Sequence, residues 1–317
     1  MPQGSMPLLR EPDARRRRLG CSPLEWCHHK GPQTIASRHM EEHIMTTSTL
    51  MTDFDGLKQK LRQTWSAGDY DRFSRYLESG AREFYERLPV APGATLLDVG
   101  CGSGQLALIA AKDGLKVTGV DIAPNWVERA RTRAQAEGLR ATFEEGDAEA
   151  LPYADTSFDV VVSLLGAMFA PRPDLVAREL LRVCVPGGTV AMANWTAQGF
   201  VGQMFKTVAK FIAPSGMPSP VLWGDEATVR ERFGPGLSSL HLAKRIYVLD
   251  YPFPPAEVVE FFRHYYGPIN RAFASLDDIG RERLRTELEG LWSEHNRVTN
   301  GATVVGAEYL EVIGTRA

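Results

Sequence analysis

The stretch that most constrains the fold of this chain runs from Leu96 to Gln105 and reads Leu-Leu-Asp-Val-Gly-Cys-Gly-Ser-Gly-Gln. An apolar run enters a glycine-rich turn and a helical period follows it, which is the pattern of a buried strand that leads into a helix. Asp121 lies 21 residues after Gly100, near the separation at which an acid that binds ribose ends the second strand. The stretch therefore predicts a nucleotide-binding βαβ unit.

The glycine spacing discriminates between two cofactors. A dinucleotide site has Gly-x-Gly-x-x-Gly/Ala, whereas this chain has Gly100-x-Gly102-x-Gly104 and Gln105 at the dinucleotide position. Asp98 adds a second carboxylate near the turn, and an unpaired carboxylate repels phosphate. The pattern favours S-adenosylmethionine over a nicotinamide dinucleotide, because S-adenosylmethionine carries a sulfonium, an ammonium and a ribose diol but no phosphate.

Three further motifs follow the glycine turn in order. They are Gly146–Tyr153 (GDAEALPY), Ser157–Ser163 (SFDVVVS) and Leu181–Gly188 (LRVCVPGG). The set resembles the motifs of class I S-adenosylmethionine-dependent methyltransferases, in particular the UbiE-like small-molecule branch with its methyltransferase type 11/25-like domain. The resemblance covers about Gly93 to Trp195, and four ordered motifs are far more specific than one glycine turn.

The resemblance and the alternating apolar periods together predict the fold. We expect an α/β fold with a doubly wound, seven-stranded, mostly parallel Rossmann-like sheet and an antiparallel last strand. The expected strands cover residues 95–99, 116–120, 141–145, 158–163, 189–193, 242–249 and 303–313. Helical periods before the first strand predict N-terminal helices that either close over the cofactor as a lid or pack on the sheet edge.

The chain divides near its start. Residues 1–50 show no sustained period and are expected to be a disordered tail or the result of a mis-assigned start, with Met45 and Met51 as alternative starts. Within this tail, Cys21, Cys27, His28 and His29 match no standard zinc spacing, so we predict no metal site.

Residues 51–317 are predicted to form a single methyltransferase domain. It comprises a cofactor-binding core over 93–195, an acceptor-side insertion over 199–235 and a C-terminal completion of the sheet over 240–317.

The resemblance implies a role for each residue of the cofactor site. Gly100, Gly102 and Gly104 would frame the methionine end, with Cys101 as a small buried residue inside the turn. Asp98 would orient the ammonium group. Asp121 would accept from the ribose hydroxyls. At the adenine, Ile122 would pack against the ring, Asp147 would accept from the amino group and the backbone of Ala148 would donate to a ring nitrogen. Ser163 and Leu164 would lie beside the transferring methyl.

The segment over 199–233 is rich in Phe, Met, Pro and Trp, and we expect it above the carboxyl ends of the strands, where open α/β sheets bind ligands. Met168, Phe200, Met204 and Trp223 are predicted to line the substrate pocket. The alternative is a helical hairpin that packs on the core, since most apolar stripes are core.

No catalytic triad is expected, because the sulfonium methyl is already electrophilic and the enzyme has to align it with the acceptor. A base is needed only for a protonated acceptor, and His264 is our candidate, ahead of Tyr265, His241 and His295. Residues 163–169 (SLLGAMF) lack the Asn/Asp-Pro-Pro-Tyr/Phe motif of amino-methylating families. This difference argues against methylation of adenine or glutamine nitrogen.

Composition excludes several classes of protein. The net charge is −3 with dispersed Lys and Arg, so we expect no nucleic-acid partner, and no apolar run is long enough for a membrane span. Four cysteines in 317 residues suggest no disulfide framework, and a cytoplasmic setting is expected.

The predicted function is S-adenosylmethionine-dependent transfer of a methyl group to oxygen, carbon or sulfur of a small-molecule acceptor. The alternatives are a catalytically silent S-adenosylmethionine-binding module, a nicotinamide-dependent reductase and a nucleic-acid methyltransferase. The sequence makes no prediction of oligomeric state.

Overall fold

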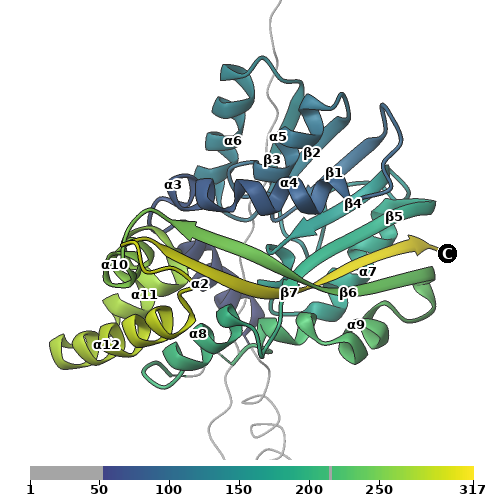
Figure 1. Cartoon of the computed structure of the whole chain (residues 1–317). Coiled ribbons are helices and arrows are strands. Elements are labelled where there is room, and N and C mark those ends of the chain that lie inside the picture. Colours follow the sequence, from purple (N-terminus) through teal and green to yellow (C-terminus); the bar gives the residue numbers. More distant parts are fainter. Residues whose placement is uncertain (1–52, 214–215) are drawn as a thin grey trace, which may run out of the picture. The chain divides into compact units, whose positions relative to one another are not determined.

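The computed structural model of the chain describes residues 53–213 and 216–317. In this part a seven-stranded sheet has the order β3-β2-β1-β4-β5-β7-β6 (Figure 1). Its strands are β1 (Thr95–Val99), β2 (Lys116–Asp121), β3 (Ala141–Glu145), β4 (Phe158–Leu164), β5 (Cys184–Trp195), β6 (Leu237–Tyr251) and β7 (Thr303–Arg316). The strands from β1 to β5 pair in parallel, and β7 lies antiparallel between β5 and β6, so the predicted fold class is confirmed. The predicted tail, with Cys21, Cys27, His28 and His29, lies outside the described residues.

Helices cover both faces of the parallel part of the sheet. They are α5 (Gln105–Lys112) and α6 (Pro124–Ala136), which contact β1, β2 and β3, and α7 (Pro173–Val183), which contacts β4 and β5. Right-handed crossovers run in opposite directions from the centre of the sheet, so α7 lies on the other face from α5 and α6. The strand order therefore reverses between β1 and β4, and open α/β sheets bind ligands at the carboxyl ends of such strands.

Helices from both ends of the described chain meet above this point. The N-terminal ones are α2 (Phe54–Trp65) and α3 (Tyr70–Ser74), and the C-terminal ones are α10 (Pro255–Tyr265), α11 (Gly267–Ala274) and α12 (Asp278–His295). The two helices that follow α3, η1 (Arg75–Leu77) and α4 (Glu78–Glu86), contact β6 and α5. Helix α2 contacts α11 and α3 contacts α10, and Figure 1 shows the C-terminal helices grouped at this side of the sheet. Segments about 190 residues apart in the sequence thus form one layer.

The predicted insertion after the fifth strand is confirmed as helical. It contains α8 (Phe200–Val208), η3 (Pro220–Gly224), α9 (Glu226–Phe233) and η4 (Gly234–Gly236), and a further short helix, η2 (Ala167–Phe169), follows β4. The last two strands are longer than the sequence predicts, because β6 and β7 pair from Leu237 with Arg316 to Tyr251 with Thr303, with one shift of register between Leu237 and Ser239. Within the described residues, we find no helix with the length and apolar character that a membrane crossing requires.

Candidate cofactor and acceptor site

The turn between β1 and α5 depends on close backbone contacts. Gly100 has φ +75°, and a Cβ at this position would lie 2.8 Å from the Cα atom of Gly166 in the turn after β4. Gly102 has φ +53°, and its Cβ would lie 2.9 Å from the ring of Tyr70. Side chains at either position would fill the space beside the turn, and left-handed backbone favours glycine. Gly104 lies immediately before α5.

Asp121 ends β2 and faces this turn. Its Oδ2 atom accepts a hydrogen bond from the Gly102 N–H at 2.8 Å, and its Oδ1 atom accepts one from the Ala123 N–H at 2.9 Å. Burial raises the pKa of the carboxyl group, and the backbone donors act in the opposite direction. Each carboxylate oxygen has a further lone pair, so the group can accept hydrogen bonds from two neighbouring hydroxyls.

Twenty residues, from α2 to the segment after η2, line a cavity, here called cavity I. The space between its walls is about 760 Å³, part of it open to solvent. Cavity I brings together six of the residues that the sequence assigns to the cofactor. These are Gly100, Gly102, Asp121, Ile122, Asp147 and Ala148.

The α2 helix closes one side of cavity I through ion pairs. Lys58 pairs with Asp147 and, at 2.7 Å, with Glu149, whose side chain is completely buried. Arg62 pairs with Glu145 at 2.5 Å. Because Leu61 and Trp65 of the same helix also line cavity I, the sequence-based alternative of simple packing on the sheet edge does not describe α2.

Replacing Lys58 with Met should loosen this helix. The change leaves Asp147 without its cation and Glu149 with Arg172 alone, and hydrogen bonds to charged groups contribute about 1.5–3 kcal/mol before solvent screening. We expect amide hydrogen exchange in α2 to become at least about fivefold faster. The control is Arg75→Met, since Arg75 is mostly exposed and its 3.6 Å ion pair with Asp71 lies outside α2. Unchanged exchange in the Lys58 variant would show that these pairs do not hold the helix.

A second cavity, cavity II, adjoins the glycine turn on its inner side. Asp98, Cys101 and Leu164 line it, so three more of the predicted cofactor residues lie together there. Gly100, Tyr70 and Leu165 line both cavity I and cavity II. Burial raises the pKa of Asp98 to about 7, and the nearby Asp121 charge acts in the same direction.

The hydroxyl group of Ser163 is hydrogen-bonded within the protein. Its hydroxyl donates to the Val99 carbonyl oxygen at 2.7 Å and accepts from the Ala167 N–H at 2.9 Å, and the residue is buried. Ser163 thus joins the ends of β1 and β4, and it lines neither cavity I nor cavity II. Gly104 also lines neither of them.

Leu165, two positions after Ser163, was not predicted from the sequence as a site residue. Leu165 has φ +57°, which is strained for a branched side chain, and its N–H donates to the Ala193 carbonyl oxygen at 3.0 Å. Non-glycine residues in this conformation concentrate at functional sites. The only hint in the sequence is Gly166, which allows the close approach to Gly100.

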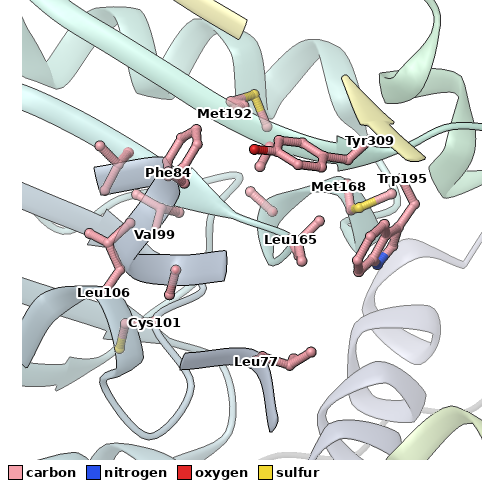
Figure 2. Packing of buried hydrophobic residues seen from close by; sticks show 14 of the residues in the cluster. Leu77, Phe84, Val99, Cys101, Leu106, Leu165, Met168, Met192, Trp195 and Tyr309 are labelled. Atoms are coloured by element: carbon pink, nitrogen blue, oxygen red, sulfur yellow. The ribbon is translucent and has the colours of Figure 1, made fainter. Parts of the chain in front are cut away.

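A third cavity, cavity III, lies beside the first. Trp65, Tyr70 and Leu165 line both cavities, so the two cavities share a wall. Figure 2 shows Leu165 of this wall and Trp195, which lines cavity III alone of the two. Met204 of the insertion and Trp195 at the end of β5 also line cavity III. Trp65 and Tyr70 were not predicted as site residues, because the helical spacing of Trp65 is equally that of a core residue and Tyr70 belongs to no recognisable motif.

The other predicted pocket residues lie elsewhere in the core. Phe200 packs against Trp292 of α12, with ring centroids 4.4 Å apart, and Trp223 packs against Phe233 at 5.9 Å. Met168 is buried in η2. None of the three lines cavities I to III. All three are buried, as their apolar side chains indicate.

His264 does not lie in these cavities either. Its side chain is 62% exposed, and its Nδ1 atom is 2.7 Å from the Glu260 carbonyl oxygen one turn earlier. The base role that we considered from sequence therefore finds no support in its position. His295 contacts the ring of Phe200, and neither it nor His241 lines cavities I to III.

Comparison with known proteins agrees with this geometry. Residues 97–192 match the sequence profile of the family described as methyltransferase domain. The uncharacterized protein Rv1405c of Mycobacterium tuberculosis is 35% identical over 238 residues, which cover 74% of this chain and 86% of that protein. Methyltransferase GfsG of Streptomyces halstedii is 40% identical over 139 residues, 42% of this chain and 50% of that protein.

A solved structure shares the fold. The YcgJ protein of Bacillus subtilis superposes with a TM-score of 0.52 at 19% identity, over 75% of this chain and 98% of that protein. Together with the motif order and the strand order, these matches place the chain in a family. The protein belongs to the class I S-adenosylmethionine-dependent methyltransferases and is an enzyme.

Proposed function

We propose that this enzyme transfers a methyl group from S-adenosylmethionine in cavities I and II to oxygen, carbon or sulfur of a small molecule in cavity III. The observation that carries this proposal is the wall that cavities I and III share, formed by Trp65, Tyr70 and Leu165. A donor and an acceptor on the two sides would lie close together, and transfer requires that these side chains leave an opening through which the acceptor atom reaches the methyl group.

The residues present fit the cofactor. Asp121 would bind the ribose diol, Asp147 the adenine amino group, and Asp98 the ammonium group. Ile122 and Ala148 would lie against the adenine, and the backbone of Gly100 and Gly102 leaves room for the methionine part. A cofactor that carries positive charge and no phosphate suits a site with three carboxylates on its walls.

The chain's contribution to the reaction is to hold and align. When bound, S-adenosylmethionine would supply an electrophilic methyl group: sulfur would keep the electron pair of the broken C–S bond, an electron pair of the acceptor atom would form the new bond, and any acceptor proton would pass to water. Trp65 and α2 restrict water on one side, and Leu165 limits the position of the acceptor atom. Alignment of this kind can supply about 7–11 kcal/mol of rate acceleration without a protein nucleophile.

A thermal-shift panel with S-adenosylmethionine, S-adenosylhomocysteine and NAD(H) tests the proposal. We expect stabilisation by the first two and none by NAD(H), followed by formation of S-adenosylhomocysteine with an acceptor from a small-molecule screen. Stabilisation by NAD(H) alone would favour a reductase. Binding without turnover of any acceptor would favour a silent module, and steeply salt-dependent binding to RNA or DNA a nucleic-acid methyltransferase.

Cofactor affinity should depend on pH through Asp98. Burial raises the pKa of Asp98 to about 7, above its value of about 3.9 in the unfolded chain. The protonated carboxyl group therefore adds to the free energy of unfolding below about pH 4, and this contribution is lost as the pH rises through 7. An ammonium group needs the charged form. We therefore expect the Kd for S-adenosylmethionine to fall about tenfold from pH 5.5 to 7.0, a range in which an α-amino group stays charged.

Calorimetric titration of the Asp98→Asn variant provides the control for this prediction. The amide does not titrate, so the pH profile of the variant should be flat over the same range. A tenfold change that persists in the variant would assign the dependence to another group.

A further inference from the structure

We propose that the free edge of β6 is a dimerisation surface, where β6 pairs antiparallel with β6 of a second copy of this chain. The two sheets would then form one continuous sheet across a two-fold axis. The contact concerns the assembly of the protein and does not rest on the proposed function.

One edge of β6 has no neighbouring strand. Within residues 53–213 and 216–317, β7 is the only strand that pairs with β6, so β6 ends the sheet (Figure 1). Its 15 residues contain no proline, and the one shift of its register lies near its start, between Leu237 and Ser239. The edge strand at the other end of the sheet, β3, has only five residues. A long, regular edge offers a row of free N–H and C=O groups that pair readily with another strand.

The outer face of β6 carries apolar side chains at this edge. Ile246 and Val248 are 47% and 44% exposed, although side chains of this kind are more often buried. Tyr247 and Leu249, which alternate with them, are buried on the inner face and line cavities II and III. Neighbouring exposed apolar residues on an edge strand indicate a surface that pairs with another strand.

Symmetry restricts the pairing that a second copy can make. A two-fold axis perpendicular to the sheet keeps each residue on its own face, so residues of the outer face pair only with one another. With the axis at Tyr247, Ile246 lies opposite Val248 of the second copy and Lys244 lies opposite its Asp250. Both charged residues are exposed. Apolar pairs and pairs of opposite charge stabilise antiparallel strands when they lie directly opposite one another, and here each pair occurs twice.

Neighbouring registers lose this complementarity. An axis at Ile246 sets Lys244 opposite Val248, and an axis at Val248 sets Asp250 opposite Ile246. An axis at Lys244 opposes two ammonium groups, which is unfavourable. The strand is therefore complementary to itself in the register centred on Tyr247, which makes a second copy of the chain the partner that it fits.

The sequence after β6 limits the length of this pairing. Residue 252 is proline, which has no N–H group to donate to a second strand. In the register centred on Tyr247, pairing therefore extends from Ala243 to Tyr251 in both copies.

Sedimentation velocity of the full-length protein over a series of concentrations tests this inference. We expect a monomer–dimer equilibrium with a Kd of about 1–100 µM, because an edge contact is smaller than an obligate interface. Ile246→Glu sets a charge opposite Val248 of the second copy and should raise the Kd at least about tenfold. The matched control is Ile279→Glu, which changes a 73% exposed isoleucine of α12 and should leave the Kd unchanged.

A charge exchange tests the register. Asp250→Lys sets two ammonium groups opposite one another at both pairs, so the Kd should rise at least about tenfold. The double variant Lys244→Glu/Asp250→Lys restores opposite charges and should return the Kd to within about threefold of the parent value. Lys244→Glu alone is less informative, because Lys244 also contacts Glu308 of β7 at 3.4 Å. Thermal melts verify that each variant folds, and the two isoleucine variants decide the result if the double variant does not.

Three outcomes would overturn the proposal. The first is a chain that sediments as a monomer throughout this range of concentrations. The second is a dimer that neither Ile246→Glu nor Asp250→Lys weakens, since it would form through another surface. The third is an open-ended series of larger assemblies, because a contact about a two-fold axis closes with two copies.

Discussion

Asp121→Ala is expected to weaken S-adenosylmethionine binding at least tenfold. The carboxylate would accept from both ribose hydroxyls, and hydrogen bonds to a charged group contribute about 1.5–3 kcal/mol each, so the loss of even one exceeds a factor of ten. The variant also frees the N–H groups of Gly102 and Ala123, which now donate to Asp121, and this further loosens the turn. Calorimetric titration measures the effect.

A matched control comes from the opposite end of the same sheet. Asp159 also accepts from a backbone N–H, that of Thr95 at 2.8 Å, and from the Thr95 hydroxyl at 2.7 Å. Asp159→Ala should therefore lower the melting temperature without a change in cofactor affinity. If the Asp121 variant binds S-adenosylmethionine as well as the parent protein does, Asp121 does not belong to the cofactor site.

Gly100→Ala is expected to have the largest effect on stability. The added Cβ would meet the Cα atom of Gly166 at 2.8 Å, and alanine would have to adopt φ +75°. Left-handed backbone costs about 1–2 kcal/mol, and forcing atoms into a packed region costs about 1–3 kcal/mol. We therefore expect the free energy of unfolding to fall by about 2–5 kcal/mol, measured by urea denaturation.

Gly114→Ala separates the cost of the left-handed backbone from the cost of the steric contact. Gly114 also has a left-handed backbone, φ +83°, but nothing lies within 4 Å of its Cβ position. This control should lose only the conformational part, about 1–2 kcal/mol. Equal losses in the two variants would show that the turns after β1 and β4 yield easily, and that their contact does not fix the geometry of the site.

Most of the residues predicted to hold the cofactor line cavities I and II, because their placement depends on local patterns and one topological rule. Asp121, Ile122 and Asp147 each follow a strand of the parallel half, and the carboxyl ends of neighbouring parallel strands meet at one edge. A glycine turn after the central strand then faces them. This information is contained in about 50 consecutive residues, from β1 to the turn after β3.

The placement of the acceptor-side residues could not be predicted in the same way. Periodicity marks Phe200, Trp223 and Met204 alike as buried, but it does not say against which surface. Phe200 packs on α12 about 90 residues later in the chain, whereas Met204 lines cavity III. Which residues a buried side chain packs against depends on segments that are distant in the sequence.

The sequence by itself predicted the parallel α/β core and the glycine turn and indicated the kind of cofactor, because each of these depends on local patterns along the chain. Only the tertiary structure decided the walls of cavity III, where α3 meets α10 and α2 meets α11 about 190 residues away, and the strained backbone of Leu165. Such features arise when the packing of distant segments outweighs local preference, and a linear pattern does not record that balance.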